Sequence, residues 1–278
     1  MGLKDLLVHV NVSKHCPARV AIAARLAKTF DARLTGLFTT AADDVAFYMV
    51  EEMALNAEPT MRAWWLRVRD KVKAEFEEAL RRTGTTTSWL EVGDKDGSAV
   101  SQHARYADLT IVGQIDPEEP LPRPEYKIPE RVALDSGCPV LVVPYAGNFT
   151  TLGSKVLIAW NSSAQSARAV RDSLPLLRKA ESVTILTINT DSQRRDEPDR
   201  PDTRIVTHLA HHGIVATARE LVVDDAMVGE TILSQASEEG VDLIVMGAYG
   251  HSRASEFVLG GATRTMFRQM TVPILVSH

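Results

Sequence analysis

The chain is short of cysteine and of long apolar runs, and both absences exclude classes of protein. Two cysteines among 278 residues cannot build a disulfide framework or a four-cysteine zinc site. Such low cysteine use is typical of the reducing cytoplasm, where we expect this protein to act. The apolar run near the N-terminus is too short for a secretory signal, and no apolar stretch approaches the ~20 residues that span a bilayer. We therefore expect no association with a membrane.

Basic residues are not in excess either. The sequence has 31 lysines and arginines against 36 aspartates and glutamates, which gives a formal net charge of −5. A protein that covers nucleic acid needs a basic surface, so we expect no nucleic-acid partner. The chain does have 45% hydrophobic and 24% charged residues, the composition of a folded globular protein. Its length is enough for two domains with cores of their own.

The sequence contains an internal duplication. Residues 5–27 and 155–177 each read as an apolar strand, an asparagine, a loop of small residues and an amphipathic helix. The two asparagines, Asn11 and Asn161, stand at matching positions, with a shift of 150 residues (161 − 11). Self-similarity of this kind indicates that one structural unit occurs twice.

A second pair of segments closes each half. At a common shift of 134 residues (241 − 107 and 272 − 138), ADLTIVGQ (107–114) matches VDLIVMGA (241–248), and CPVLVVP (138–144) matches VPILVSH (272–278). The repetition predicts two domains of one kind, residues 1–146 and 154–278, joined by a short linker.

The order of the elements predicts the fold class. Continuous Val/Ile/Leu strands that alternate with helical segments predict α/β domains, each a doubly wound, parallel, five-stranded sheet with helices on both faces. In the second half we expect strands near 155–160, 182–188, 215–223, 242–246 and 273–277, and helices near 164–179, 203–212, 227–239 and 261–270. The first half follows the same order, with an insertion at 42–84 that predicts two helices, the second of them long.

The segment GAYGHSRASEFVLGG (247–261) follows a predicted strand and precedes a predicted helix. Ligands of open α/β sheets bind at the carboxyl ends of the strands, and the free N–H groups of a helix start favour an anion. Its glycines would let the backbone approach a ligand closely. The segment is neither a Walker A loop nor a G-x-G-x-x-G fingerprint. It predicts a polyphosphate site, and the alternative is a glycine hinge without a ligand.

The spacing of Gly247, Gly250 and Gly260, with VMG before it and VPILV after it, resembles the ATP-binding motif of the universal stress protein family. The duplication resembles the tandem members of that family. The resemblance implies the universal stress protein fold, which is like that of the adenine-nucleotide alpha hydrolases, and a role in stress response or signalling. It also implies an ATP site, with Mg²⁺ accompanying the nucleotide. The implied binding residues are Asn161 and Ile188 at the adenine, Met246 and Gly247 at the base and ribose, and Tyr249, Gly250, Gly260, Gly261, Ala262 and Thr263 around the phosphates.

The chain departs from the family pattern at two of these positions. Asn161 stands where ATP-binding members have an acidic residue, although an asparagine amide can also pair with the N6/N7 edge of adenine. Gly261 stands where the family usually has Ser or Thr, so one hydroxyl contact to phosphate is lost, and Thr263 is the nearest substitute.

The first half departs much further. The shift of 134 residues puts Asp116, Tyr126 and Lys127 where the second half has three glycines. Prolines in this segment remove N–H donors, and its acidic side chains, Asp116 and Glu119 among them, would repel phosphate. We expect this half not to bind ATP in the family's manner.

The remaining patterns bear on metals, catalysis and assembly. His208, His211 and His212 share one face of a predicted helix, but no acidic or thiol partner is evident nearby, so we expect solvated histidines and no metal. No nucleophile–base pair is evident, so at most the slow ATP hydrolysis or self-phosphorylation that the family allows is implied. The alternative function is a nucleotide-free adaptor that binds a protein partner or a small apolar ligand. The apolar last strands predict that the two halves pair as an intramolecular pseudo-dimer, and they leave room for a homodimer.

Overall fold

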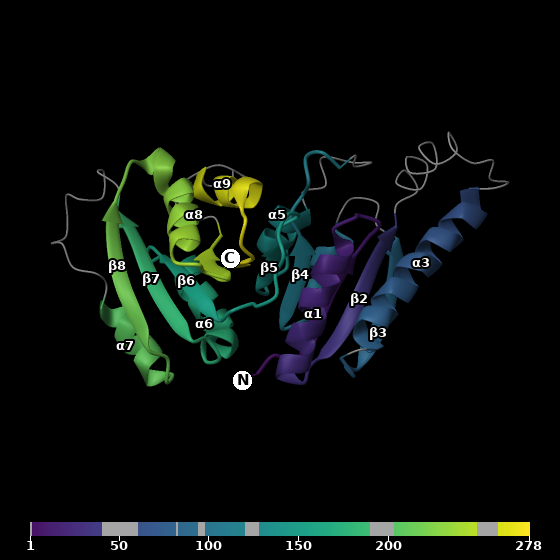
Figure 1. Cartoon of the computed structure of the whole chain (residues 1–278), viewed down its shortest axis with the longest axis horizontal. Coiled ribbons are helices and arrows are strands. Elements are labelled where there is room, and N and C mark those ends of the chain that lie inside the picture. The colour runs from purple at the N-terminus through teal and green to yellow at the C-terminus, as the bar shows by residue number, and fades with distance from the viewer. Residues whose placement is uncertain are drawn as a thin grey trace. The chain divides into compact units, whose positions relative to one another are not determined.

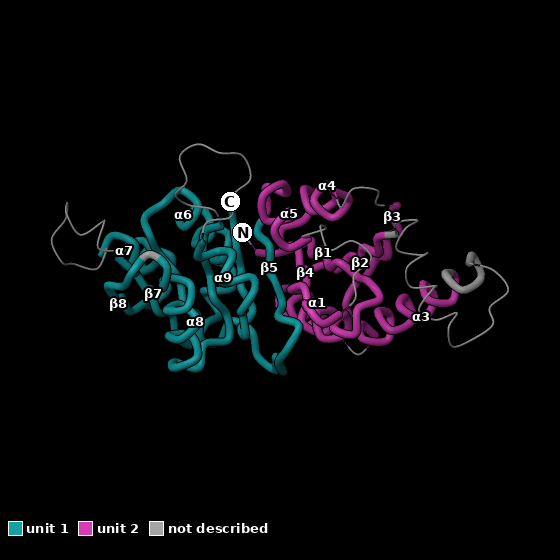
Figure 2. The backbone as a smooth tube through the Cα atoms, turned by 90° about the horizontal axis from the view of Figure 1, so that it is seen from above, with its two compact units in different colours: residues 1, 139–278 teal, residues 2–138 magenta. Residues whose placement is uncertain are grey.

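The computed structural model describes residues 2–40, 61–81, 83–93, 98–119, 128–189, 203–248 and 261–278. The chain forms two compact units, Gly2–Cys138 and Pro139–His278 (Figure 2). Both units are α/β, as the sequence predicts, and their elements are labelled in Figure 1.

The first unit is a parallel sheet with helices on both faces. Its elements are β1 (Asp5–Val10), α1 (Cys16–Phe30), β2 (Arg33–Thr40), α3 (Met61–Arg81), β3 (Thr87–Gly93), α4 (Ala99–Ala104), β4 (Leu109–Gly113) and α5 (Ile128–Asp135). The strands lie in the order β3-β2-β1-β4, and all of these pairs are parallel. Helices α1 and α3 cover one face, and α4 and α5 cover the other (Figure 2).

The second unit repeats this arrangement and adds one antiparallel strand. Its elements are β5 (Val140–Val143), β6 (Lys155–Trp160), α6 (Ala164–Leu177), β7 (Ser182–Asn189), α7 (Thr203–His211), β8 (Ala216–Val222), the 3₁₀ turn η1 (Asp225–Met227), α8 (Val228–Glu238), β9 (Leu243–Gly247), α9 (Gly261–Gln269) and β10 (Ile274–Ser277). The strand order is β5-β10-β9-β6-β7-β8. The pairs are parallel except that β5 runs antiparallel to β10.

The doubly wound fold class is confirmed. In each sheet the chain moves outward over two crossovers and then returns to the other side of the first strand, which is the doubly wound order. The predicted strands and helices of the second half agree with the structure to within two residues at each end. The long insertion helix is α3, and the helix expected before it lies outside the described residues. The pairing of β5 with β10 places the boundary between the compact units at Cys138, ahead of the predicted domain end at residue 146.

The inner strands explain why the apolar runs are continuous. The first four residues of β4 and of β9 are all buried, because helices cover both faces of a parallel sheet. The edge strand β8 alternates between half-buried and exposed residues along most of its length. No helix in the described ranges is both long enough and apolar enough to cross a membrane.

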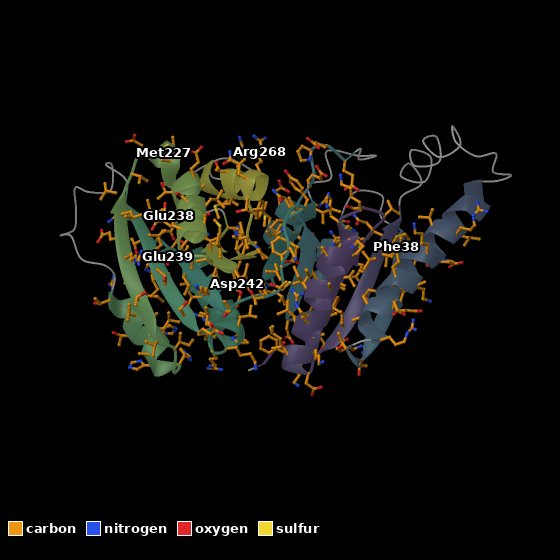
Figure 3. The ribbon with its side chains drawn as sticks, in the orientation of Figure 1. Phe38, Met227, Glu238, Glu239, Asp242 and Arg268 are labelled. Atoms are coloured by element: carbon orange, nitrogen blue, oxygen red, sulfur yellow. The ribbon has the colours of Figure 1, made fainter. Side chains whose placement is uncertain are left out.

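An aspartate ties the returning strand to the first strand in both halves. The carboxylate of Asp108 accepts the backbone N–H of Asp5 at 3.0 Å, and the Asp108 N–H donates to the Asp5 carbonyl at 2.8 Å. Asp242, labelled in Figure 3, forms the same pair with Lys155 at 2.9 and 3.0 Å. The duplication thus extends to the hydrogen bonds that set the register at the start of β1 and β6.

Candidate functional site

Each sheet has a topological switch point, where neighbouring strands send their connections to opposite sides. In the second unit this point lies between β6 and β9, and in the first it lies between β1 and β4. The diverging connections leave an opening at the carboxyl ends of these strands, and ligands of open α/β sheets bind there.

Four of the expected site residues lie at the carboxyl edge of the second sheet. Asn161 directly follows β6, and Ile188 lies one residue beyond the last position at which β7 pairs with β6. Met246 and Gly247 end β9, where Met246 pairs with Ala159 of β6. The strand register therefore places these four residues at one level. Met246 is buried, Ile188 and Gly247 are half-buried, and Asn161 is exposed.

Asn161 is held by the turn that starts α6. Its side-chain oxygen accepts the Ser163 backbone N–H at 3.2 Å and the Ser163 hydroxyl at 2.7 Å. The Ser163 hydroxyl in turn accepts the Ser166 N–H at 3.1 Å and so caps the helix. A backbone N–H can only donate, so these bonds fix which end of the amide is the oxygen. The amide nitrogen is then the group that Asn161 can offer to a ligand base as a donor.

Gly247 is required for close packing of β9 against α6. A Cβ atom built on Gly247 would lie 2.5 Å from the Ser166 backbone nitrogen and 2.7 Å from the Gln165 carbonyl carbon. The side of Gly247 that a side chain would occupy therefore faces the first turn of α6. This contact brings the N–H groups at the start of α6 to the same edge as Asn161.

The described start of α9 holds the three remaining site residues that the structure places. Gly261 is exposed and has no atom within 4 Å of a built Cβ, Ala262 is half-buried, and Thr263 is only 4% exposed. Helix α9 contacts η1, which follows the carboxyl end of β8, so α9 lies on the carboxyl side of the sheet (Figure 1). Tyr249, Gly250 and Gly260 lie outside the described residues, and their roles stay predictions.

In the first sheet an arginine fills the corresponding edge. Arg19 is only 3% exposed, and its guanidinium donates to the His9 carbonyl and to the Asn11 side-chain oxygen, both at 2.8 Å. A Cβ built on Gly113, at the end of β4, would lie 2.1 Å from one of its nitrogens. The shift of 150 residues puts Ala169 at this position in the second half. The sequence analysis missed this residue, although an arginine aligned with an alanine on the buried face of a helix is a readable signal.

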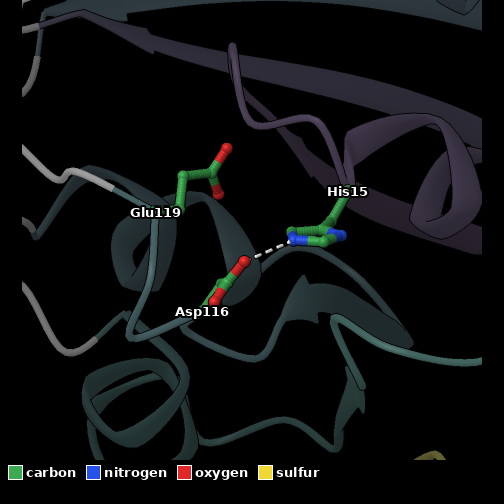
Figure 4. Close-up of side chains that lie close together, drawn as sticks. All are labelled: His15, Asp116 and Glu119. Atoms are coloured by element: carbon green, nitrogen blue, oxygen red, sulfur yellow. Dashed lines mark hydrogen bonds and ion pairs between the residues drawn. The ribbon is translucent and has the colours of Figure 1, made fainter.

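The acidic residues beyond β4 bind to the loop before α1. Asp116, whose side chain is 5% exposed, lies 2.8 Å from His15 Nε2 and 3.1 Å from Lys14 Nζ (Figure 4). The hydrogen bond with His15 is the main cause that lowers the pKa of Asp116 to about 2, while burial acts in the opposite direction. Glu119 accepts the Ser13 hydroxyl at 2.6 Å and the Lys14 backbone N–H at 3.0 Å. Two carboxylates expected only to repel phosphate are therefore bound to the chain's own donors.

The histidines in and just after α7 do not gather acidic or thiol ligands in the described part of the chain. The rings of His208 and His212 meet edge to face at 4.8 Å, and His212 Nδ1 lies 3.3 Å from an Arg178 nitrogen. Burial is the main cause that lowers the pKa of His212, with the charges of its neighbours adding to it. The group of side chains that does have metal-ligand spacing within the described ranges is His15, Asp116 and Glu119.

The strand order defines a doubly wound α/β protein, and four of its expected binding residues lie at the carboxyl edge of its second sheet. Residues 154–278 match the family model of the Universal stress protein family. This half of the chain is thus similar to members of the universal stress protein family.

Two known relatives show the same similarity. The chain is 38% identical over 56 residues to the universal stress protein Slr1230 of Synechocystis, a match that covers 20% of this chain and 19% of that protein. It is 38% identical over 58 residues to the universal stress protein MJ0577 of Methanocaldococcus jannaschii, covering 20% of this chain and 36% of that protein. The matched segments thus span well under two thirds of either relative.

Solved structures extend the likeness of fold to the whole chain. A universal stress protein from Archaeoglobus fulgidus superposes with a TM-score of 0.71 at 16% identity, covering 98% of this chain and 97% of that one. A functionally unknown protein from Pseudomonas aeruginosa, PA1789, gives a TM-score of 0.63 at 14% identity, covering 99% and 92%.

Proposed function

We propose that residues 154–278 form a domain that binds ATP or another adenine nucleotide, accompanied by Mg²⁺. Residues 1–146 form a second domain of the same fold that does not bind nucleotide in this manner. The protein acts in the cytoplasm in stress response or signalling, and it is not a dedicated enzyme. The observation that carries the proposal is the gathering of Asn161, Ile188, Met246 and the start of α6 at the switch point of the second sheet.

The proposed binding mode follows the polarity of this edge. Adenine lies over Ile188 and Met246 and accepts a hydrogen bond from the Asn161 amide nitrogen. The phosphates lie toward Gly261 and Ala262, at the start of α9, where N–H groups without helical partners favour negative charge. The low exposure of Thr263 favours its two predecessors as the residues that face phosphate. Tyr249, Gly250 and Gly260 complete the phosphate loop, and Mg²⁺ offsets the charge of the phosphates.

Arg19 explains why we propose that the first domain does not bind nucleotide in this manner. Its guanidinium occupies the space beside Gly113 and Asn11 that corresponds to the proposed nucleotide edge. A nucleotide there would have to displace a buried, hydrogen-bonded charge, which is costly.

Titration calorimetry with ATP and with tripolyphosphate tests the site. We expect one ATP per chain, and we expect Asn161→Ala to weaken ATP about fivefold, since it removes one hydrogen bond to the base. The affinity for tripolyphosphate should not change, because that ligand has no base. The matched variant Asn11→Ala, in the first half, should leave ATP affinity unchanged, with circular dichroism as the check on folding.

Two equivalent ATP sites would contradict the assignment of the first half. No ATP binding, together with no nucleotide released from heat-denatured pure protein, would overturn the proposal. That outcome would favour the adaptor alternative, in which a protein or a small apolar ligand is the partner.

The variant Gly261→Ser tests the position of the phosphates. A serine side chain meets no atom within 4 Å at its Cβ, so the fold should be retained. Its hydroxyl would add one hydrogen bond to a charged phosphate, and we expect ATP and tripolyphosphate each to bind about tenfold more tightly. The control Gly261→Ala should show no such gain. Equal affinities for the serine and alanine variants would contradict phosphate binding at this turn.

We also propose that the two halves pair through their last strands as a pseudo-dimer, with a homodimer of chains as a further assembly. The antiparallel pairing of β5 with β10 supports this proposal, because β5 closes the first half of the sequence and β10 closes the second. A crystal structure in which these two strands are apart would overturn it. Size-exclusion chromatography with light scattering distinguishes a single chain from a dimer.

A further inference from the structure

The first half carries a group of polar side chains that the proposed nucleotide site does not use. His15 is the last residue of the loop between β1 and α1, and Asp116 and Glu119 follow β4. In Figure 4 the imidazole of His15 and the carboxylate of Asp116 face each other, and the Glu119 side chain lies beside them. One ligand atom from each of the three residues lies within 4.8 Å of the other two.

We propose that His15, Asp116 and Glu119 form a binding site for a first-row divalent metal ion, with Zn²⁺ as the ion that fits best. One imidazole nitrogen and two carboxylates form a mixed donor set. Imidazole suits zinc, copper, iron and nickel, while carboxylates alone suit magnesium, calcium and manganese. Zinc binds both kinds of donor, and it is stable with three protein ligands and one open coordination position.

The spacing of the donors is close to what zinc requires. Ligands at 2.0–2.2 Å from a tetrahedral zinc ion lie roughly 3.4 Å from one another, a value that follows from those bond lengths. His15 Nε2 and Asp116 Oδ2 are already 2.8 Å apart, and the largest separation in the group is no more than 4.8 Å. A rotation of the Glu119 side chain, which would give up its bonds to the Ser13 hydroxyl and the Lys14 N–H, would bring its carboxylate to this distance. His15 then binds through Nε2 as the neutral imidazole, so the proton that Nε2 shares with Asp116 must leave this atom.

Lys14 already brings a cation to this group of side chains. Its ammonium lies 3.1 Å from Asp116 Oδ2, the same oxygen that His15 contacts, while 62% of the lysine side chain is exposed. Asp116 itself is 5% exposed, so its charge is largely withheld from water and needs a partner. A divalent ion would replace the ammonium, and the flexible lysine could return to solvent at little cost. Lys14 is therefore the competitor of the metal.

The position of the group within the duplication supports a ligand site. The shift of 134 residues aligns Asp116 with Gly250, in the glycine loop of the second half. The first half has thus replaced glycines that would face an anion with side chains that attract a cation. The metal site would include the residue that the duplication aligns with Gly250.

The test uses the full chain, stripped of metal, in a His208→Asn/His211→Asn/His212→Asn background that removes the three histidines in and just after α7 as competing ligands. Calorimetry with ZnCl₂ should give one site per chain, and Co²⁺ as a second probe should give the visible absorption of a bound ion. His15→Gln and Glu119→Gln should each weaken Zn²⁺ at least tenfold. Lys14→Met should strengthen Zn²⁺ about threefold or more, because it removes the competing charge.

The ligand variants should weaken Zn²⁺ binding and Lys14→Met should strengthen it, and these opposite changes distinguish a metal site from an ion-pair network. If the group only joins the segment after β4 to the loop before α1, neither the parent chain nor Lys14→Met will bind Zn²⁺ with a saturable stoichiometry, and this result would overturn the proposal. Unchanged Zn²⁺ affinity in folded His15→Gln and Glu119→Gln variants would overturn it as well. Circular dichroism checks folding, and Lys14→Met keeps the test decisive even if the ligand variants fold poorly.

Discussion

Gly247→Ala is expected to lower the free energy of unfolding of the second half by about 3 kcal/mol, the upper end of the usual cost of overpacking. The added Cβ would lie 2.5 Å from the Ser166 nitrogen and 2.7 Å from the Gln165 carbonyl carbon. Both atoms belong to the backbone, so no side-chain rotation can relieve the overlap. The start of α6 would have to move away from β9, and the expected nucleotide edge would open with it. Urea denaturation followed by circular dichroism measures the effect.

Gly261→Ala is the matched control for this prediction. Gly261 has no atom within 4 Å of a built Cβ, and its backbone is compatible with a side chain. Alanine favours the helix over glycine by up to ~1 kcal/mol, so this variant should be as stable as the parent or slightly more stable. Similar losses of stability in both variants would contradict the packing argument at Gly247.

The chain is also expected to lose about 2 kcal/mol of stability between pH 7.5 and pH 5 because of His9 alone. His9 is 3% exposed on β1, with Nε2 at 3.2 Å from the Thr39 hydroxyl. Burial, and after it the charge of Arg19, lowers the pKa of His9 to about 3 from its ordinary 6.5. Below pH 6.5 the unfolded chain therefore binds a proton that the folded chain does not. Stability falls as the pH falls through this window, and the loss continues down to the folded pKa of about 3.

The variant His9→Gln isolates this contribution. Glutamine can still bond to the Thr39 hydroxyl but does not titrate, so the slope of stability against pH should decrease by the share of His9. The carboxyl of Asp116 does not interfere, because its lowered pKa of about 2 confines its contribution to pH values below its ordinary 3.8. Urea midpoints at pH 7.5, 6 and 5 give the two slopes. Identical slopes for the parent and His9→Gln would show that the buried histidine is not the cause.

The elements were predictable because their signals are local. The apolar run of β9 and the pattern of α6 lie within single segments, and burial on both faces of a parallel sheet makes such runs continuous. The gathering of Asn161 and Met246 at one edge followed from the rule that parallel strands end on the same side. These are properties of the fold class, and the pattern of the chain is enough to reveal them.

Contacts across the chain were not predictable in the same way. His15 and Asp116 are 101 residues apart, and their contact depends on the register of β1 against β4. The acidic segment was correctly identified as a departure, but the loop that it binds could not be read from spacing. The burial of Thr263 likewise depends on how α9 is rotated against α8, where Gly229 lies close to Thr265. Helical periodicity alone does not fix that rotation.

In the first half, the buried guanidinium of Arg19 occupies the place that a ligand would take, and it cannot dissociate because it is part of the chain. The stability of such a domain does not rise with the concentration of free nucleotide, because mass action applies only to molecules that can dissociate. Under the proposed binding, the second half would instead become more stable as the cellular nucleotide level rises, by RT ln(1 + [L]/Kd). The duplication would then have produced one half whose stability does not depend on nucleotide and one half whose stability rises with the nucleotide concentration. The difference between the halves would come from one repeated position, which holds Arg19 in the first half and Ala169 in the second.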